Sequence, residues 1–251
     1  MVNQLSDEQR AVLEHVLRYR LTVPRTLAAT GIVSEEGEDA ARQTLTNLQQ
    51  NGWLRSADLY PGHRQDQYFH LSDSAAQYLG QDPVVARPLK HDMRVESFAI
   101  ATFCCCGDKF RQLLTKEEFK SRLPDLWYTG QPVRYYLEEG EDQVVRLAFI
   151  KVDTAGAGRW DRLIDSCNRF LRQRVTVSLS SPKNRTQVQA FAKLVDQGRF
   201  QFTVLTAMNE KKRAIELELE RRVLAGEPVP PMQVHVVPGM FHVLFPAPQP
   251  G

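Results

Sequence analysis

Hydrophobic residues in the first third of the chain recur at two different periods. A capping box begins at Ser6 and Gln9, and apolar residues then follow at helical spacing. Further on, apolar residues fall in two short extended runs, and a turn that contains Pro and Gly separates them. The pattern predicts, in order, a helix from Ser6, a helix over 23–30, a helix from Ser34 to 50, strands over 53–59 and 66–71, and a short helix over 73–78.

The rest of the chain alternates amphipathic stretches with short apolar runs. Residues 144–152 are strongly apolar, which is typical of a strand at the centre of a sheet. We expect helices over 89–106, 117–122, 159–172, 187–196 and 209–224, and strands over 133–137, 144–152, 175–179, 200–205, 232–237 and 241–245. This order predicts an α+β protein whose second part is a mixed α/β sheet flanked by helices.

Charge and composition change near residue 80, where Pro-containing breaks interrupt the pattern. Residues 1–80 contain no lysine and carry seven arginines against ten acidic residues, whereas residues 81–251 carry 25 basic and 20 acidic residues. We therefore expect a first domain over 1–82, a linking helix over 83–108, a second domain over 109–246 and a loose tail over 247–251.

The order of the first domain, short helices followed by a β-hairpin, is that of a winged helix-turn-helix domain. In such a domain the third helix enters the DNA major groove, and the hairpin forms the wing. The predicted DNA contacts are Arg42, Gln43, Thr46, Asn47 and Gln50 on the outward face of the third helix, with Arg55, His63 and Arg64 on the wing.

Acidic residues at the start of the third helix oppose simple electrostatic attraction to DNA. Glu35, Glu36, Glu38 and Asp39 stand at the end that usually enters the groove, where they would repel phosphates. The sequence therefore leaves two uses of a winged helix open: one is DNA binding, and the other is dimerisation or partner docking.

Several classes of site lack their sequence signatures. Cys104, Cys105, Cys106 and Cys167 have neither a disulfide nor a zinc spacing, and the chain contains neither a P-loop nor a dinucleotide fingerprint. Apolar runs are too short for a membrane helix, and no signal segment follows Met1. We expect a cytoplasmic protein without a cofactor or a bound metal.

Short motifs are distributed along most of the chain. They are the segment 68–72 (YFHLS), His91-Asp92, Pro132, the segment 147–154 (LAFIKVDT), the helix 160–171 and the segment 202–206 (FTVLT). In these motifs the chain resembles the replication-relaxation family of bacterial mobile elements. Members look like a winged helix joined to a restriction-endonuclease-like domain, and they are associated with the replication and mobilisation of plasmids or integrative elements. The resemblance implies a role linked to DNA.

The chain departs from that family where a nuclease-like domain carries its acidic residues. The family pattern has a Pro-Asp pair before the first strand, but this chain has Pro132-Val133, and Lys151 replaces the acid two positions before Asp153. A divalent metal needs two or more converging oxygen ligands, and the lysine charge opposes its binding. We expect a nuclease fold without catalysis, in which Asp153 is a residual position that acts as a structural cap or an ion-pair partner.

Two further possibilities stay open in the second domain. Glu138 and Glu139 could serve as migrated metal ligands of a rearranged nuclease. A basic cluster that could track a phosphate backbone, or be a solvated loop, consists of Arg172, Arg174, Lys183 and Arg185.

The sequence favours a noncatalytic DNA-binding protein of a plasmid or integrative element that acts in replication, mobilisation or their regulation. Expected partners are double-stranded DNA, replication or mobilisation proteins, and a second copy of the chain, against which the charged helix 209–224 would pack. The alternatives are a metal-dependent nuclease with rearranged ligands and a protein–protein interaction module without DNA contact.

Overall fold

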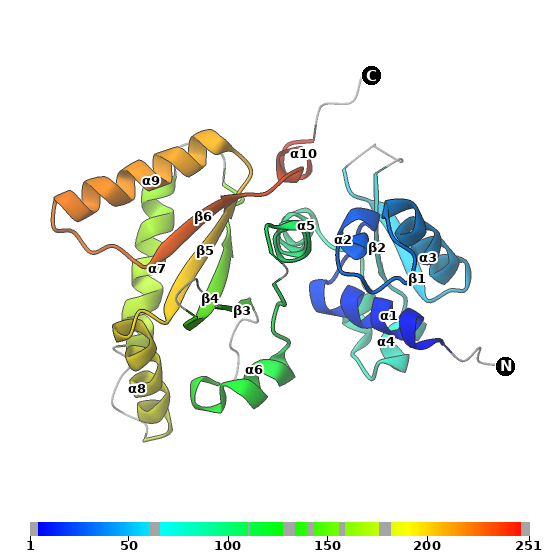
Figure 1. Ribbon diagram of the computed structural model, residues 1–251, viewed down its shortest axis with the longest axis horizontal. Coiled ribbons are helices and arrows are strands. Elements are labelled where there is room, and N and C mark those ends of the chain that lie inside the picture. Colours follow the sequence, from blue (N-terminus) through cyan, green and yellow to red (C-terminus); the bar gives the residue numbers. More distant parts are fainter. Residues whose placement is uncertain are drawn as a thin grey trace. The chain divides into compact units, whose positions relative to one another are not determined.

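The computed structural model describes residues 5–60, 66–109, 111–127, 134–139, 143–155, 159–175 and 182–246. These residues form a mixed α+β protein with one two-stranded and one four-stranded sheet, as the sequence predicts at this coarse level (Figure 1). The chain divides into two compact units. Unit 1 comprises Met1–Arg111 and Pro238–Gly251, and unit 2 comprises Gln112–Val237. The segment 83–108 therefore belongs to unit 1, and the chain returns to unit 1 after residue 237.

Unit 1 is built mainly from helices around one β-hairpin. Its elements are α1 (Asp7–Tyr19), α2 (Pro24–Ala28), α3 (Glu38–Gln50), β1 (Leu54–Asp58), β2 (Gln67–Leu71), α4 (Asp73–Tyr78), the 3-10 helix η1 (Pro83–Ala86), α5 (His91–Cys106) and α10 (Met240–Leu244). Apolar residues spaced three or four apart on α1 and α3 meet residues of the hairpin in a common core. The capping box is present, because Ser6 and Gln9 exchange hydrogen bonds of 3.1 Å at the start of α1.

The hairpin is extended by one residue from the segment between α1 and α2. The strands β1 and β2 are antiparallel, and Leu54 pairs with Leu71 at the base. On the other side of β2, Thr22 N–H donates to the Phe69 carbonyl at 2.9 Å, and Phe69 N–H donates back at 2.8 Å. The loop after α1 is therefore joined to the hairpin by a reciprocal pair of backbone hydrogen bonds.

The third helix begins later than predicted, at Glu38 instead of Ser34. The N–H of Ser34 donates to Oε2 of Glu8 on α1 at 3.0 Å, and the Ser34 hydroxyl bonds to the same atom. Gly37 then has φ +104°, a conformation that L side chains rarely adopt and that interrupts helical geometry. A tertiary contact and a glycine thus displace the start of the helix from Ser34 to Glu38.

The predicted strand over 241–245 is wrong, because this run is the helix α10. Met240 and Val243 are fully buried three positions apart, whereas Phe241 and Phe245 are partly exposed. Gly239, with φ +80°, turns the chain into the helix. A short apolar run fits both the strand and the helix period, so periodicity alone does not distinguish them.

Unit 2 is a four-stranded sheet with helices in its crossovers. Its elements are α6 (Lys116–Arg122), the 3-10 helix η2 (Pro124–Leu126), β3 (Tyr135–Glu139), β4 (Val145–Val152), α7 (Trp160–Val175), α8 (Pro182–Asp196), β5 (Phe200–Thr206), α9 (Asn209–Leu224) and β6 (Met232–Val236). The strand order is β3-β4-β5-β6; β3 is antiparallel to β4, and the other neighbours are parallel. A hairpin is therefore followed by two helical crossovers.

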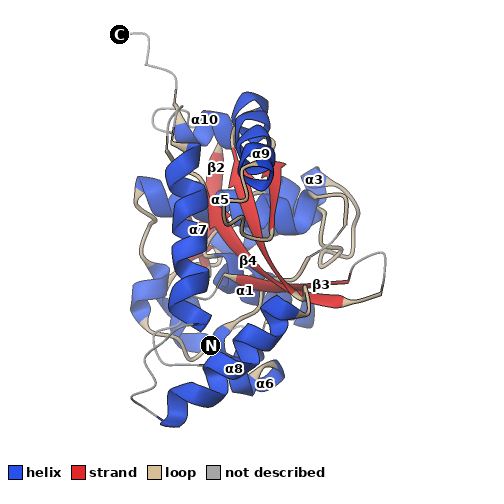
Figure 2. Ribbon diagram, turned by 90° about the vertical axis from the view of Figure 1, so that its left-hand side faces the viewer, coloured by secondary structure: helices blue, strands red, loops and turns tan. Residues whose placement is uncertain are grey.

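One face of this sheet is covered by α7, α8 and α9 (Figure 2). Phe149 on β4 and Phe200 and Phe202 on β5 surround Phe170 of α7, with ring centroids 4.9–6.4 Å apart. Because side chains alternate along a strand, Lys151 and Asp153 follow Phe149 on the same face. This alternation directs the charged end of β4 toward the helices.

The two helices after β4 are longer than the sequence predicts. Val175 was expected to begin a strand but is the last residue of α7, and the rest of that predicted strand lies outside the described residues. The following helix begins at Pro182, which suits the first turn of a helix because its missing N–H would have no helical partner there.

Candidate functional site

The outward face of α3 carries most of the predicted DNA contacts. Ala41, Leu45 and Leu48 are fully buried and hold the opposite face against the core of unit 1. The exposed side chains are Arg42, Gln43, Asn47 and Gln50, and Thr46 is half-buried. The helix therefore presents one arginine and three amides on a continuous solvent-facing stripe.

Two of these exposed side chains bond to neighbours one helical turn away. Arg42 donates from Nη2 to Oε1 of Glu38 at 3.1 Å, and Gln43 donates from Nε2 to Oδ1 of Asn47 at 2.9 Å. Ion pairs and hydrogen bonds on an exposed helix face contribute little to stability. A ligand can therefore replace them at small cost.

The predicted wing is only partly described. Arg55 on β1 is exposed and donates from Nη2 to Oδ2 of Asp73 at 2.7 Å, at the start of α4. This contact holds the Arg55 side chain toward the base of the hairpin. His63 and Arg64 lie outside the described residues.

A shallow groove of about 550 Å³ lies between the end of α3, the first residues of β1 and the start of α4. Its lining consists of Gln49, Gly52, Leu54, Arg55, Ser56, Ser72 and Ser74. Gln49 donates from Nε2 to Oγ of Ser56 at 2.9 Å across the groove. Of the lining residues, only Arg55 was predicted as a contact, because the hydroxyl groups come together through hairpin pairing and carry no local motif.

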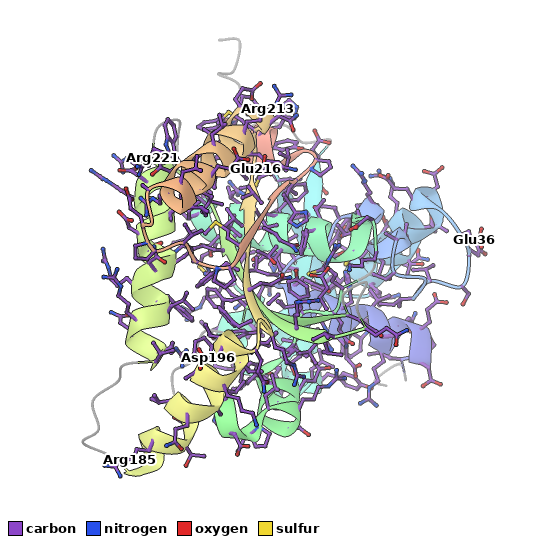
Figure 3. The ribbon with its side chains drawn as sticks, turned by 60° about the vertical axis from the view of Figure 1, so that its left-hand side comes forward. Glu36, Arg185, Asp196, Arg213, Glu216 and Arg221 are labelled. Atoms are coloured by element: carbon purple, nitrogen blue, oxygen red, sulfur yellow. The ribbon has the colours of Figure 1, made fainter. Side chains whose placement is uncertain are left out.

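Exposed carboxylates lie around the start of α3, next to its solvent-facing stripe. Glu35, Glu36, Glu38 and Asp39 are all exposed around the start of α3, and Figure 3 shows Glu36 on the segment before the helix. Their charges lower the attraction of this end of α3 for phosphates. Contacts with base edges, or with a basic protein partner, are less affected than contacts with a phosphate backbone.

Asp153 in unit 2, which the sequence predicts to be a residual nuclease position, forms a buried ion pair with a lysine. Lys211 of α9 places Nζ 2.5 Å from Oδ2 of Asp153, and the side chains of the lysine and the aspartate are only 3% and 6% exposed. Lys211 also donates to the Ala155 carbonyl at 2.6 Å, and Ala155 N–H donates to Oδ1 of Asp153 at 3.3 Å. An ammonium group of the protein thus occupies the place beside Asp153 where a cation would bind.

The other residues of the nuclease pattern also bond within the protein. Lys151 donates to the hydroxyl of Ser166 on α7, which donates in turn to the Leu163 carbonyl at 2.8 Å. Glu138 accepts a hydrogen bond of 2.8 Å from Gln201 on β5. Val133 lies outside the described residues, and Glu139 is exposed at the end of β3. Within the described residues, no group of three His, Cys, Asp or Glu side chains is arranged to hold a metal ion.

Three of the four cysteines are buried thiols with suppressed ionisation. Burial raises the pKa of Cys105 to about 12 and that of Cys167 to about 11, and it also raises the pKa of Cys104. A reactive cysteine needs a lowered pKa because the thiolate is the nucleophile. These side chains therefore pack as small apolar groups at neutral pH.

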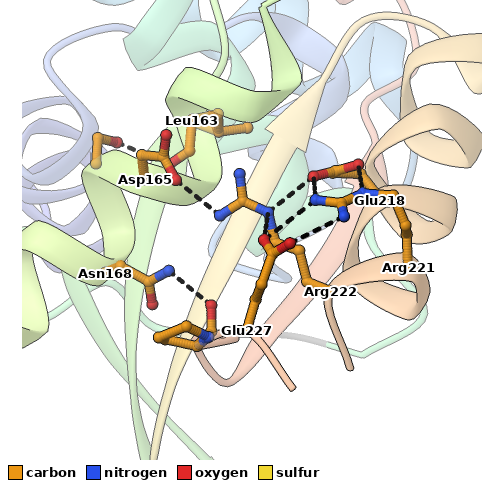
Figure 4. A network of polar contacts seen from close by, with 9 residues as sticks. Leu163, Asp165, Asn168, Glu218, Arg221, Arg222 and Glu227 are labelled. Carbon is orange, nitrogen blue, oxygen red and sulfur yellow. Dashed lines mark hydrogen bonds and ion pairs between the residues drawn. The ribbon is translucent and has the colours of Figure 1, made fainter. Parts of the chain in front are cut away.

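A charged network ties α9 to α7 (Figure 4). Arg222 donates to Asp165 of α7 at 2.7 Å and to Glu218 at 2.8 Å, while Arg221 binds both Glu218 and Glu227. The hydrogen bonds from Arg221 and then Arg222 lower the pKa of Glu218 to about 2. The charged side chains on this side of α9 therefore bond to other residues of unit 2.

The basic cluster in unit 2 is only partly available to a ligand. The guanidinium of Arg174 lies 5.2 Å from the ring centroid of Phe170, whereas Arg172 and Arg185 are exposed. The side chain of Lys183 lies outside the described residues. Of this cluster, the structure therefore shows two exposed arginines and one arginine that lies over an aromatic ring.

Comparison with protein-family models, with curated proteins and with solved structures found no match for this chain. Within the described part of the chain, no helix combines the length and apolar character that a membrane crossing requires.

Proposed function

We propose that this chain is a noncatalytic protein that binds double-stranded DNA through a winged helix in unit 1. The order α1, α2, α3 and hairpin supports this assignment, as does the pairing of Thr22 with Phe69, which adds a third strand position to the wing. In this arrangement α3 enters the major groove and the β1–β2 hairpin contacts the flanking backbone.

The observation that carries the proposal is the amide-rich stripe of α3. Gln43, Asn47 and Gln50 are exposed on the side opposite the core, and amide groups can donate and accept at once. Asn and Gln side chains form paired hydrogen bonds with adenine in the major groove, while arginine forms them with guanine. The stripe therefore suits recognition of base edges more than neutralisation of phosphates.

Unit 2 is proposed to be a restriction-endonuclease-like domain that serves as a scaffold. An antiparallel hairpin that continues into parallel strands supports this fold. The buried pair of Asp153 with Lys211 supports the absence of catalysis, because a metal-dependent nuclease needs converging oxygen ligands around a divalent ion. The setting in replication or mobilisation of a mobile element rests on the family resemblance alone.

A second candidate function is the docking of a basic protein partner. It is favoured by the exposed carboxylates Glu35, Glu36, Glu38 and Asp39, which would attract such a partner and repel DNA. In that case unit 1 would bind a protein partner and would not bind duplex DNA.

Arg42→Ala is expected to weaken binding to duplex DNA about tenfold, equivalent to about 1.4 kcal/mol, because a base-edge contact by arginine is lost. Arg10→Ala is the matched control, since Arg10 and Arg42 are each exposed and paired with a glutamate one helical turn away, at 3.0 and 3.1 Å. The control should change the affinity less than twofold. Fluorescence anisotropy measures both variants, at low and then at physiological salt, on a duplex that the wild type has selected from a random pool.

Equal losses in Arg42→Ala and Arg10→Ala would mean that only net charge matters, and the assigned surface would be wrong. An absence of binding to duplex in low salt would reject the DNA proposal and leave protein docking. Incubation of supercoiled plasmid with Mg²⁺ or Mn²⁺ should leave it intact. Nicking that disappears in Asp153→Asn, with the variant shown to be folded by circular dichroism, would overturn the noncatalytic assignment.

A further inference from the structure

The solvent-facing side of α9 carries large apolar residues that no described part of the chain covers. Leu217 is 65% exposed and Leu224 is 88% exposed, and both lie on one stripe because they are seven residues apart. The opposite side of the helix packs against the sheet through Ile215, which is fully buried. An exposed leucine alone is ordinary, but two on one stripe of a well-packed helix mark a contact surface.

The same stripe also carries exposed residues of opposite charge. Arg213 and Glu220 are exposed, and neither forms an ion pair with any residue that the structure describes. Most other charged residues of α9 are engaged, since Arg221 and Arg222 bind Glu218 and Lys212 pairs with Glu216. Glu210 is also exposed and forms no ion pair with a described residue. Figure 3 shows Arg213, Glu216 and Arg221 projecting from this helix. Between Arg213 and Glu220 the stripe therefore runs from a positive side chain through an apolar one to a negative one.

We propose that α9 is a self-association surface on which a second copy of this chain packs its own α9 in antiparallel orientation. Arg213 and Glu220 are about 10.5 Å apart along the axis, and Leu217 lies close to their midpoint. A two-fold axis beside Leu217 therefore brings Arg213 of each copy next to Glu220 of the other, and the two Leu217 side chains meet at the centre. This isologous pairing satisfies both charges twice.

The charge order is what selects a second copy as the occupant. The segment from Arg213 to Glu220 has its two opposite charges placed symmetrically about a leucine, so these charges pair with those of a second copy only when the helices run antiparallel. The helix is about 24 Å long, so the contact is smaller than a standard protein interface and a weak dimer is expected. The inference uses unit 2 only and does not depend on DNA binding.

Charge reversal tests this arrangement in the full-length protein. The wild type is expected to shift from monomer to dimer between about 1 and 200 μM in sedimentation velocity. Arg213→Glu and Glu220→Arg should each remain monomeric, because each homodimer then holds two like-charge contacts. An equimolar mixture of the two variants should dimerise again, since a mixed pair holds two opposite-charge contacts. In one contact the two substituted side chains face each other, and in the other the two native side chains do. Arg169→Glu reverses an exposed charge on α7 and should dimerise as the wild type does.

Restoration in the mixture, together with loss of dimer in Leu217→Lys, would establish the antiparallel pair. A wild-type chain that stays monomeric at 200 μM would overturn the proposal. A dimer that persists unchanged in both single variants would overturn it as well, because self-association would then use another surface. All substituted side chains are exposed, so circular dichroism should show unchanged folding in every variant.

Discussion

Asp153→Asn is expected to lower the free energy of unfolding of unit 2 by about 3–5 kcal/mol. The change removes the charge that compensates Lys211, whose side chain is 3% exposed. A buried ammonium group without a counter-ion retains its desolvation cost and loses its Coulomb attraction. Urea unfolding measured by tryptophan fluorescence in a Trp53→Phe background reports on unit 2, because Trp127 and Trp160 both lie there.

Removal of both charges provides the control. The double variant Asp153→Leu/Lys211→Met should lose much less stability than Asp153→Asn, since replacing a buried ion pair by apolar residues of similar size is often close to neutral. A double variant that is as unstable as the single variant would show that the charge pair is not the source of the effect. Unchanged stability in Asp153→Asn would show that Lys211 reaches water without Asp153.

Acidification from pH 6.5 to pH 4 is expected to lower the free energy of unfolding of unit 1 by about 3 kcal/mol through His15. Burial, and then the positive charge of Arg18, lower the pKa of His15 from 6.5 to about 4. The ring bonds to the Thr22 hydroxyl at 3.1 Å, which in turn lies 3.0 Å from that of Thr26. Between these pH values the unfolded chain takes up a proton that the folded chain excludes.

The sign follows from this difference in proton binding. The contribution of His15 is fully present above pH 6.5, falls as the pH approaches 4, and changes no further below that value. His15→Gln keeps a polar atom for Thr22 but does not titrate, so its unfolding free energy should vary less over this range. Burial also lowers the pKa of His70, which adds a dependence of the same sign in both proteins. Equal pH dependence in the wild type and His15→Gln would refute the role of His15.

The strongly periodic elements of this protein could be predicted from the sequence. The predicted start of α1 at Ser6 and the central strand β4 match the structure because each is specified by neighbouring residues, through a capping box and a continuous apolar run. The start of α3 could not be predicted, because it depends on a contact between Ser34 and Glu8 of another helix. The short apolar run over 241–245 fits both the helix period and the strand period. Its packing and the turn at Gly239 are what make it a helix.

The candidate sites divide in the same way. The exposed stripe of α3 follows from the helical positions that Leu45 and Leu48 leave outward, so Gln43 and Asn47 could be selected from the sequence. The groove beside Ser56 and Ser72 could not, because hairpin pairing brings these residues together. The partner of Asp153 was not foreseeable either, since Lys211 is one of two adjacent lysines in a helix with many charged residues.

The sequence by itself determined which residues form helices and strands over most of the chain, and which side of each amphipathic helix is apolar. These properties depend on short-range spacing, which the chain carries without its fold. Only the tertiary structure decided that Lys211 forms the ion pair with Asp153, and which charged side chains of α9 remain exposed. Both depend on contacts between residues far apart in sequence. These contacts form when the sheet and the helices pack, because a charge that is buried without a partner then costs free energy.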